Sequence, residues 1–293
     1  MDTIGRHMLF GYAKRLRPTF VMLAQQMFWD EALEAAVECA AVSELIHCAS
    51  LFHDDVIDGA KTRKGRRAAS AVWGNKSAVI VGDYFFVLAY SLLAKQQDLK
   101  LIEIYIDTCR TLAEGVMLEL GHMGDVDISE EAHLEIITRK TATFFQTTAL
   151  VGGYSGGADD DQQEHLREFG LNFGLAFQLS DDLLDLYADP AATGKPRGTD
   201  IRSGIYTTAV IRALASNPDF HRTYHEILKG DGLTSEVIDE IVEALRTNGA
   251  FQYTRELIQS YGNQALRHLD ALPDGRAGAA FRALVQRILA RRY

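Results

Sequence analysis

Proline is scarce in this chain and is absent from its longest segment. Only five prolines occur among 293 residues, and residues 19–189 contain none. Because proline interrupts regular elements, this stretch is free to form long helices, and its apolar residues recur with helical rather than alternating spacing. No strand–turn–strand pattern appears. The sequence therefore predicts an all-α protein.

Cysteine is also scarce. The three cysteines, Cys39, Cys48 and Cys109, are an odd number and lack the spacing of a metal site. All three fall within apolar helical segments, so we expect reduced thiols and a cytoplasmic location. The N-terminus lacks an apolar core with a cleavage site, so no signal peptide is expected. No uninterrupted apolar run looks long enough to form a transmembrane segment.

Basic residues are outnumbered, with 30 against 40 acidic residues and a net charge of −10. This balance argues against nucleic acid as the main partner. The composition is 47% hydrophobic, which is enough to bury a large core. The length allows one or two domains. Because no domain boundary, low-complexity tract or short repeat is visible, we expect one domain over residues 1–293.

Helical spacing and end signals divide the chain into long helices. Ser129 is expected to cap one of them, with acidic Glu130 and Glu131 in its first turn. Polar loops are expected over 59–74 and 189–204. The predicted helices cover 18–28, 31–58, 75–95, 99–121, 129–152 and 160–187, followed by shorter and more polar helices over 205–293.

Two aspartate triplets stand in this apolar helical sequence with the same spacing, i, i+1 and i+4. Residues four apart share one face of a helix. One triplet alone is often only a solvated helix end, but carboxylates are seldom buried without a partner. Two facing clusters in a helical bundle suit hard cations such as Mg²⁺, which is usually held by carboxylates together with substrate phosphates. The triplets are Asp54, Asp55 and Asp58, and Asp181, Asp182 and Asp185.

Several basic residues accompany the triplets, and each has two explanations when taken alone. The run Lys14-Arg15-Leu16-Arg17-Pro18 is either a solvated turn before a helix or a phosphate site. His47, two helical turns before Asp54, is either a core histidine or a ligand contact. Lys140, in an apolar helix, either extends to solvent or holds an anion. Lys195, in a glycine-flanked loop, is a weak phosphate motif.

Together these motifs resemble the all-trans polyprenyl diphosphate synthase family. The resemblance covers nearly the whole chain, from Lys14 to about residue 215, which we take as the catalytic core. The segments that carry it are Lys14–Pro18, Glu44–Asp58, Arg63–Gly65, Lys140-Thr141 and Phe177–Asp185. The resemblance implies an isoprenoid-synthase-type helical bundle around a central cavity, normally assembled as a homodimer.

The resemblance also implies an activity. The enzyme would condense isopentenyl diphosphate with an allylic diphosphate, using three Mg²⁺ ions held by all six aspartates. The positively charged side chains beside the allylic diphosphate would be Arg63, Lys140 and Lys195, with Thr141 and Gln178 nearby. Isopentenyl diphosphate would be held by Lys14, Arg17, His47 and Lys64.

Product length should depend on the residues before the first triplet. Ala49 and Ser50 are the fifth and fourth residues before Asp54, so they would line the floor below the allylic tail. Short-chain members tend to place an aromatic residue there, whereas this sequence has small residues. Bacterial farnesyl-type enzymes have extra residues within the first triplet, whereas this sequence has no extra residues between Asp55 and Asp58. We therefore expect a product of twenty carbons or longer.

Three departures from the family pattern leave alternatives open. Ile205 stands where many members carry a further lysine, Lys64 replaces an arginine, and only 13 residues precede Lys14, where an additional helix is usual. The alternatives are a class I terpene cyclase, which shares the fold and the first triplet, and an inactive regulatory subunit, which has the fold without activity. Cyclases usually replace the second triplet and such subunits lose aspartates, so six intact aspartates favour chain elongation.

Overall fold

The computed structural model describes residues 2–9, 14–63, 65–187, 197–230 and 233–291. The chain forms two compact units. The first unit comprises Met1–Cys109, Thr147–Leu166 and Leu272–Gly278. The second unit comprises Arg110–Gln146, Arg167–Ala271 and Ala279–Tyr293. The expectation of a single domain over the whole chain stays a prediction.

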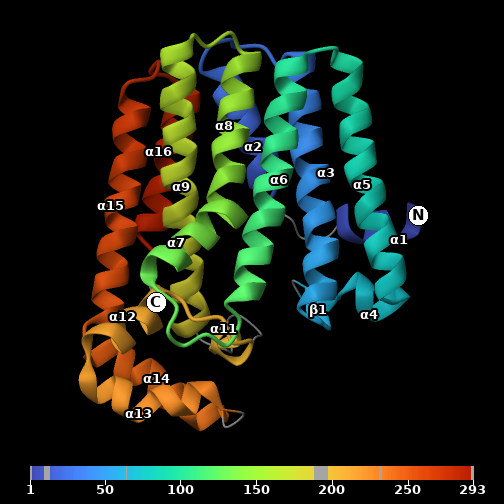
Figure 1. Ribbon diagram of the computed structural model, residues 1–293. Helices are drawn as coiled ribbons and strands as arrows, with labels where there is room; N and C mark the ends of the chain where they lie inside the picture. Colours follow the sequence, from blue (N-terminus) through green and yellow to red (C-terminus); the bar gives the residue numbers. More distant parts are fainter. Residues whose placement is uncertain (1, 10–13, 64, 188–196, 231–232, 292–293) are drawn as a thin grey trace. The chain divides into compact units, whose positions relative to one another are not determined.

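The described residues are almost entirely helical, which confirms the all-α prediction (Figure 1). The predicted helices over 99–121 and 160–187 match α6 and α9 residue for residue. The helices up to α9 are α1 (Asp2–Leu9), α2 (Leu16–Gln26), α3 (Glu34–Ile57), α4 (Ala69–Trp73), α5 (Asn75–Gln96), α6 (Leu99–Gly121), α7 (Glu130–Ile137), η1 (Thr138–Ala142), α8 (Thr143–Ser155) and α9 (Asp160–Tyr187). The remaining ones are α11 (Thr199–Arg202), α12 (Thr208–Ser216), α13 (Pro218–Lys229), α14 (Ser235–Thr247), α15 (Ala250–Asp270) and α16 (Arg276–Leu289).

In the first unit, α3 packs along α5 and α2, and Figure 1 shows α3 and α5 side by side. Apolar side chains of α3 and α5 meet at Phe52 and Phe85, whose ring centroids are 5.5 Å apart. Gly82 lets the two helices approach closely, because a Cβ there would lie 2.4 Å from Nε2 of His53. The packing therefore fixes the face of α3 that carries the first aspartate triplet.

A short hairpin interrupts the expected loop over 59–74. Its strands β1 (Thr62–Arg63) and β2 (Arg66–Arg67) pair antiparallel, and α4 follows directly. Gly65 has a φ of +77°, a left-handed conformation that glycine adopts without strain. Two-residue strands are too short to show an alternating pattern, which explains why the sequence did not reveal them.

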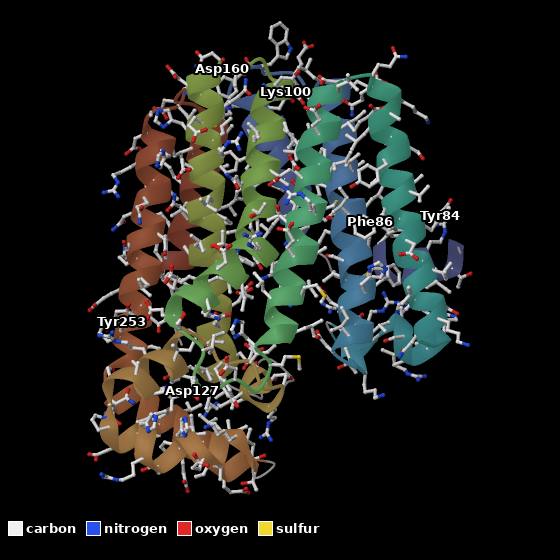
Figure 2. The ribbon with its side chains drawn as sticks, viewed as in Figure 1. Tyr84, Phe86, Lys100, Asp127, Asp160 and Tyr253 are labelled. Atoms are coloured by element: carbon white, nitrogen blue, oxygen red, sulfur yellow. The ribbon has the colours of Figure 1, made fainter. Side chains whose placement is uncertain are left out.

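In the second unit, α12 packs against α7, α13 and α15, and α14 packs against α15. Tyr253 of α15, labelled in Figure 2, donates a hydrogen bond of 2.6 Å to Oε1 of Glu130 in the first turn of α7. The predicted cap is confirmed, because Ser129 Oγ accepts a hydrogen bond of 3.1 Å from the backbone N–H of Ala132. These contacts hold the start of α7 in place.

The predicted helix over 129–152 contains an unpredicted π-turn, η1, between α7 and α8. Glycines of α6 and α9 pack against its backbone. A Cβ on Gly115 would lie 2.8 Å from the backbone nitrogen of Lys140, and a Cβ on Gly174 would lie 2.5 Å from Cα of Ala142. The π-turn is thus closely packed on two sides. Such turns are frequent at functional sites, and this one contains Lys140 and Thr141.

Two helices of the described chain, α3 and α5, are long and apolar enough to cross a membrane by length and composition alone. The apolar stretch of α3 is 61% buried, as in the core helix of a soluble protein, whereas that of α5 is 33% buried. Two such helices are weak evidence for a membrane span. The expectation that no segment crosses a membrane therefore stays a prediction.

Candidate active site

The first aspartate triplet lies at the C-terminal end of α3, in the first unit. Asp54 is half-buried, Asp55 is fully buried, and Asp58 is exposed just after the last helical residue. The three carboxylates therefore differ in exposure, although the sequence pattern treats them alike.

The hairpin supplies the counter-charge to the buried Asp55. Arg63 Nε donates a hydrogen bond of 2.6 Å to Asp55 Oδ1, and this pair is mostly shielded from solvent. A buried carboxylate needs such a partner because desolvation disfavours its charged form. Arg63 thus contacts the first triplet, and the contact depends on β1.

Two residues that are predicted to bind isopentenyl diphosphate lie close together beside α3, on the N-terminal side of Asp54. Arg17 of α2 lies 3.2 Å from His47, measured between Nη1 and Nε2. Burial lowers the pKa of Arg17 to about 10, while the charges of Glu44, Cys48 and Asp54 raise it. Arg17 therefore remains charged at neutral pH. Glu44 is buried beside this pair and also faces Arg15, with 3.8 Å between Nη1 and Oε1.

The remaining predicted contacts of isopentenyl diphosphate are Lys14 and Lys64. Lys14 is exposed just before α2. Lys64, and also Lys195 on the allylic side, lie outside the described residues.

The second triplet, in the second unit, is tied to η1 by a chain of side-chain hydrogen bonds. Thr141 Oγ1 donates to Gln178 Oε1 at 3.0 Å, and Gln178 Nε2 donates to Asp182 Oδ1 at 2.8 Å. Asp182 is buried, and its other oxygen faces His133 at 3.5 Å. The structure therefore brings Thr141 to Gln178, which lies 37 residues later in the sequence, and through it to Asp182.

Lys140 provides positive charge beside this row. Its Nζ forms an ion pair with Glu119 of α6, and both side chains are mostly shielded from solvent. Burial raises the pKa of Asp200, and the same ammonium group partly opposes this rise. Lys140 therefore faces an acidic cluster, rather than extending to open solvent as one explanation of the sequence allowed.

Asp185 and Asp200 are two neighbouring carboxyl groups of this cluster whose pKa values are both raised. The backbone N–H of Asp200 donates to Asp185 Oδ2 at 3.1 Å. Burial raises the pKa of Asp185, and hydrogen bonds from Thr199 and Asp200 oppose this. Burial, followed by the charges of Asp185 and Asp182, raises the pKa of Asp200 well above its usual range. The cluster has an excess of negative charge, so it favours cations.

Replacing Asp200 with asparagine is expected to raise the melting temperature of the protein in EDTA by about 3 °C or more at about pH 8. A raised pKa means that the folded protein binds the proton more tightly than the unfolded chain. Stability is therefore lost as the pH rises from the ordinary range of an aspartate toward the raised pKa. Asparagine avoids this loss, and near pH 4 the advantage should shrink. Thermal melts at both pH values provide the measurement.

The exposed Asp219 on α13 supplies a control, because its side chain pairs with Arg222, which is also exposed to solvent. Asp219→Asn is expected to shift the melting temperature by no more than about 2 °C at either pH. An Asp200→Asn protein that is no more stable than the original at the higher pH would contradict the prediction.

Asp181, the first member of the second triplet, contacts the C-terminal segment. Arg291 donates hydrogen bonds to Asp181 Oδ1 at 2.5 Å and to Ser180 Oγ at 3.0 Å. The guanidinium also lies over the ring of Phe177, 5.5 Å from its centroid. Arg291 thus partly neutralises a carboxylate that the sequence assigned to metal binding.

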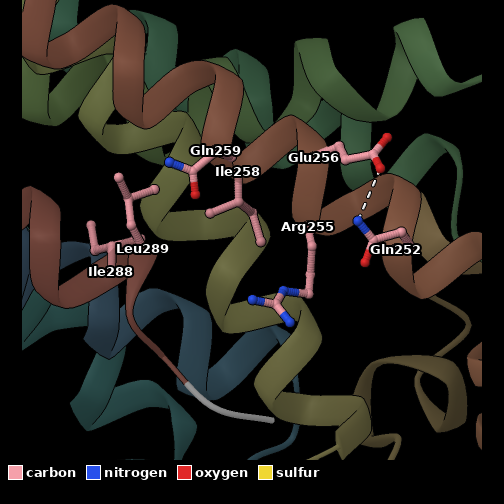
Figure 3. Close-up of a pocket in the computed structure, with 7 residues that line it drawn as sticks. All are labelled: Gln252, Arg255, Glu256, Ile258, Gln259, Ile288 and Leu289. Carbon is pink, nitrogen blue, oxygen red and sulfur yellow. Dashed lines mark hydrogen bonds between the residues drawn. The ribbon is translucent and has the colours of Figure 1, made fainter.

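Within the described ranges, no group of three or more histidine, cysteine or acidic side chains lies close enough to hold a metal ion by itself. A pocket of about 240 Å³ opens between α15 and the end of α16, but it contains none of the predicted site residues (Figure 3). Its lining residues are Gln252, Arg255, Glu256, Ile258, Gln259, Ile288 and Leu289.

Comparison with known proteins accounts for this set of motifs. The polyprenyl synthetase family model matches residues 1–245, which is most of the chain. The chain belongs to the polyprenyl synthetase family. This confirms the family that the sequence motifs indicated. The prediction of a catalytic core over about 14–215 is not tested by the match.

Individual relatives cover nearly the whole chain of this polyprenyl synthetase. It is 32% identical to octaprenyl diphosphate synthase of Escherichia coli strain K12 over 274 residues, which is 94% of this chain and 84% of that one. It is 30% identical to geranylgeranyl diphosphate synthase of Methanosarcina mazei over 275 residues, 92% and 83% of the two chains. These relatives differ in the product that their names state.

A solved structure confirms the fold class. The polyprenyl synthase of Caulobacter crescentus CB15, crystallised with calcium and isoprenyl diphosphate, superimposes with a TM-score of 0.93. The two proteins are 33% identical, and the match covers 100% of this chain and 89% of that one. The central cavity of the expected bundle stays a prediction for this polyprenyl synthetase.

Sequence reasoning missed several residues of the site. His133, Glu119 and Asp200 lie among the predicted residues of the second unit, and Arg291 contacts Asp181. Each is a single polar residue in an ordinary amphipathic or loop context, without a repeated spacing. The only available signal was the position of Asp200 in the same glycine-flanked loop as Lys195.

Proposed function

We propose that this polyprenyl synthetase is a chain-elongating trans-prenyltransferase that joins isopentenyl diphosphate to an allylic diphosphate. The observation that carries the proposal is the row Thr141–Gln178–Asp182 with Lys140 beside it. It places amide, hydroxyl and ammonium donors next to carboxylates, as a site for a metal-bound diphosphate requires. Relatives named octaprenyl and geranylgeranyl diphosphate synthases support elongation.

The carboxylates fit Mg²⁺ by the chemistry of their donors. Each triplet has two carboxylates that are not fully buried: Asp54 and Asp58, and Asp181 and Asp185. Hard oxygen ligands of this kind suit Mg²⁺, and the phosphates of the substrate complete such sites. When bound, the metal stabilises the negative charge that develops on the departing diphosphate. The Caulobacter relative, crystallised with calcium and isoprenyl diphosphate, supports a divalent ion here.

Asp55 and Asp182 have a different part in this proposal. Both are buried, and each has one oxygen hydrogen-bonded to a neighbouring side chain, Asp55 to Arg63 and Asp182 to Gln178. They would orient the groups around them and add negative charge that attracts cations. The prediction that all six aspartates ligate metal, with three ions bound, stays a prediction.

The chain's own cations would divide between the two substrates. Lys140 would bind oxygens of the allylic diphosphate, for which Arg63 also remains a predicted contact, and electrostatic stabilisation of the leaving group would favour cleavage of the carbon–oxygen bond. Arg17 and His47, which lie 3.2 Å apart, would hold the diphosphate of isopentenyl diphosphate. Lys14, Lys64 and Lys195 remain predicted contacts.

Incubation with Mg²⁺, isopentenyl diphosphate and allylic primers of five to twenty carbons tests the proposal. Product length is read by mass spectrometry after phosphatase treatment. A ladder that ends at one dominant length supports elongation. Release of hydrocarbon without condensation would indicate a terpene cyclase. No reaction with any primer would favour an inactive regulatory subunit, to be checked by a search for a partner synthase subunit.

Product length is proposed to be twenty carbons or longer. Ala49 is fully buried in α3, and Ser50 is half-buried with its hydroxyl bonded to the carbonyl of His47 at 2.9 Å. Ala49→Phe is expected to shorten the dominant product by at least one five-carbon unit, because a ring on this face would fill the space below the allylic tail. Mass spectrometry of the products provides the measurement.

Ser50→Phe is the companion variant, because a half-buried position accepts a larger side chain with less overpacking than Ala49. An unchanged product length in both variants, with melting temperatures near that of the original, would refute the floor assignment.

A homodimer is proposed from an apolar stripe on α5. Ile80, Tyr84 and Val87 follow helical spacing, and they are 58%, 44% and 61% exposed; Figure 2 shows Tyr84 on the outer side of α5. Exposed apolar patches commonly mark protein–protein contacts. Light scattering is expected to give the mass of two chains, and Ile80→Glu with Val87→Glu should give one chain. A monomeric original protein would contradict this.

A further inference from the structure

Two buried polar atoms face each other beside the second triplet. The side chains of His133 and Asp182 are only 5% and 6% exposed, and His133 Nε2 lies 3.5 Å from Asp182 Oδ2. Within the described part of the chain, neither atom has a hydrogen-bond partner. Buried polar atoms are rarely left unpaired, and a protonated Nε2 is the donor that this oxygen lacks. A small movement would turn this contact into a hydrogen bond.

The surrounding contacts limit how these groups can move. Asp182 Oδ1 accepts the hydrogen bond from Gln178, which lies one turn earlier on α9. His133 belongs to α7, whose first turn is fixed by the Ser129 cap and by the hydrogen bond from Tyr253 to Glu130. The segment formed by α7 and η1 runs opposite to α9 here, because Thr141 of η1 contacts Gln178 while the earlier His133 of α7 contacts the later Asp182. Asp182 is thus held on one side by its own helix and on the other by α7.

We infer that His133 is a positioning residue for the second aspartate triplet. Its contact with Asp182 fixes the orientation of that carboxylate and so sets the affinity of this site for a divalent cation. The inference rests on the proposed function. The carboxylate of Asp182 adds to the negative charge felt by Asp185 and Asp200, and it orients Gln178. Without its second contact, Asp182 would lose its fixed orientation. Loss of this contact is therefore expected to weaken the binding of the metal and of the allylic diphosphate, and to leave the binding of isopentenyl diphosphate unchanged.

The test compares His133→Gln with His133→Asn. Both variants introduce the same amide, but only glutamine places its nitrogen at the distance of Nε2 along the side chain. The probe is Mn²⁺ alone, titrated into the free protein and followed by electron paramagnetic resonance. Replacing a group that orients the side chains of a metal site typically changes the metal affinity of that site roughly 10- to 100-fold. We expect His133→Asn to weaken Mn²⁺ binding by about tenfold or more, and His133→Gln to remain within about threefold of the original protein.

Kinetics add a second readout that general damage would not reproduce. In His133→Asn the KM for the allylic primer should rise with the Mn²⁺ dissociation constant, while the KM for isopentenyl diphosphate should stay within about twofold. His225→Leu is the control, because His225 also faces a carboxylate, that of Asp127 at 3.1 Å on the surface. It is expected to change neither quantity, and melting temperatures of all variants confirm folding.

Three outcomes would overturn the inference: unchanged Mn²⁺ binding in His133→Asn, equal loss in the glutamine and asparagine variants, or equal rises in both KM values. Failure of the proposed function looks different. If the original protein condenses no primer, the proposed function is wrong, yet the Mn²⁺ titrations of the free protein still decide the role of His133.

Discussion

Replacement of Lys140 by glutamine is expected to lower the turnover of elongation by about 100-fold or more. Lys140 lies in the π-turn η1, ion-paired with Glu119 and directed at the acidic cluster of the second unit. A fixed positive charge stabilises the leaving diphosphate far more strongly in a shielded site than in water. Glutamine keeps most of the side-chain length but no charge. Steady-state kinetics with saturating Mg²⁺ and both substrates provide the measurement.

Arg139 is the matched control for this experiment. It is the adjacent residue of the same turn and also pairs with acidic groups, Glu114 and Glu135, but at a more exposed position. The hydrogen bond and charge of Glu135 raise its pKa, so it is a permanent cation. Arg139→Gln is expected to retain activity within about threefold. Lys140→Gln with more than a third of the original activity, or an equal loss in both variants, would contradict the assignment.

A methyl group added at Gly174 is expected to damage the site from a distance. Its Cβ would lie 2.5 Å from Cα of Ala142 and 3.0 Å from Cβ of the same residue. Backbone cannot yield as a flexible side chain can, so α9 and η1 must separate. Overpacking of this kind costs about 1 to 3 kcal/mol of unfolding free energy. Because η1 carries Lys140 and Thr141, the turnover of the folded protein should also fall, by about tenfold or more.

Gly121→Ala, at the end of α6, is the control for this substitution. No atom of the described residues lies within 4 Å of a Cβ placed there, and alanine is a better helix former than glycine by about 0.5 to 1 kcal/mol. We expect a melting temperature equal to or above the original, with unchanged activity. Thermal melts and steady-state kinetics of both variants decide the matter. A Gly174→Ala protein as stable and active as the original would show that η1 does not depend on this contact.

Helix positions followed from the sequence because they depend on local spacing. The apolar period of the segments over 99–121 and 160–187 was long and regular, and the Ser129 cap combined a local acceptor with acidic residues. Short elements had no such signal. The hairpin β1–β2 has strands of two residues, and η1 adds a single wide turn inside an otherwise helical pattern.

The sequence by itself determined the helical class, the two aspartate triplets and the family, because each depends on residue type and spacing along the chain. Only the tertiary structure distinguished the members of each triplet. It buried Asp55 against Arg63 and Asp182 against Gln178 and His133. Burial and ion pairing arise between elements that are distant in sequence, so identical aspartates acquire different exposure and different partners. The same physical reason placed Lys140 beside Glu119 and Asp200.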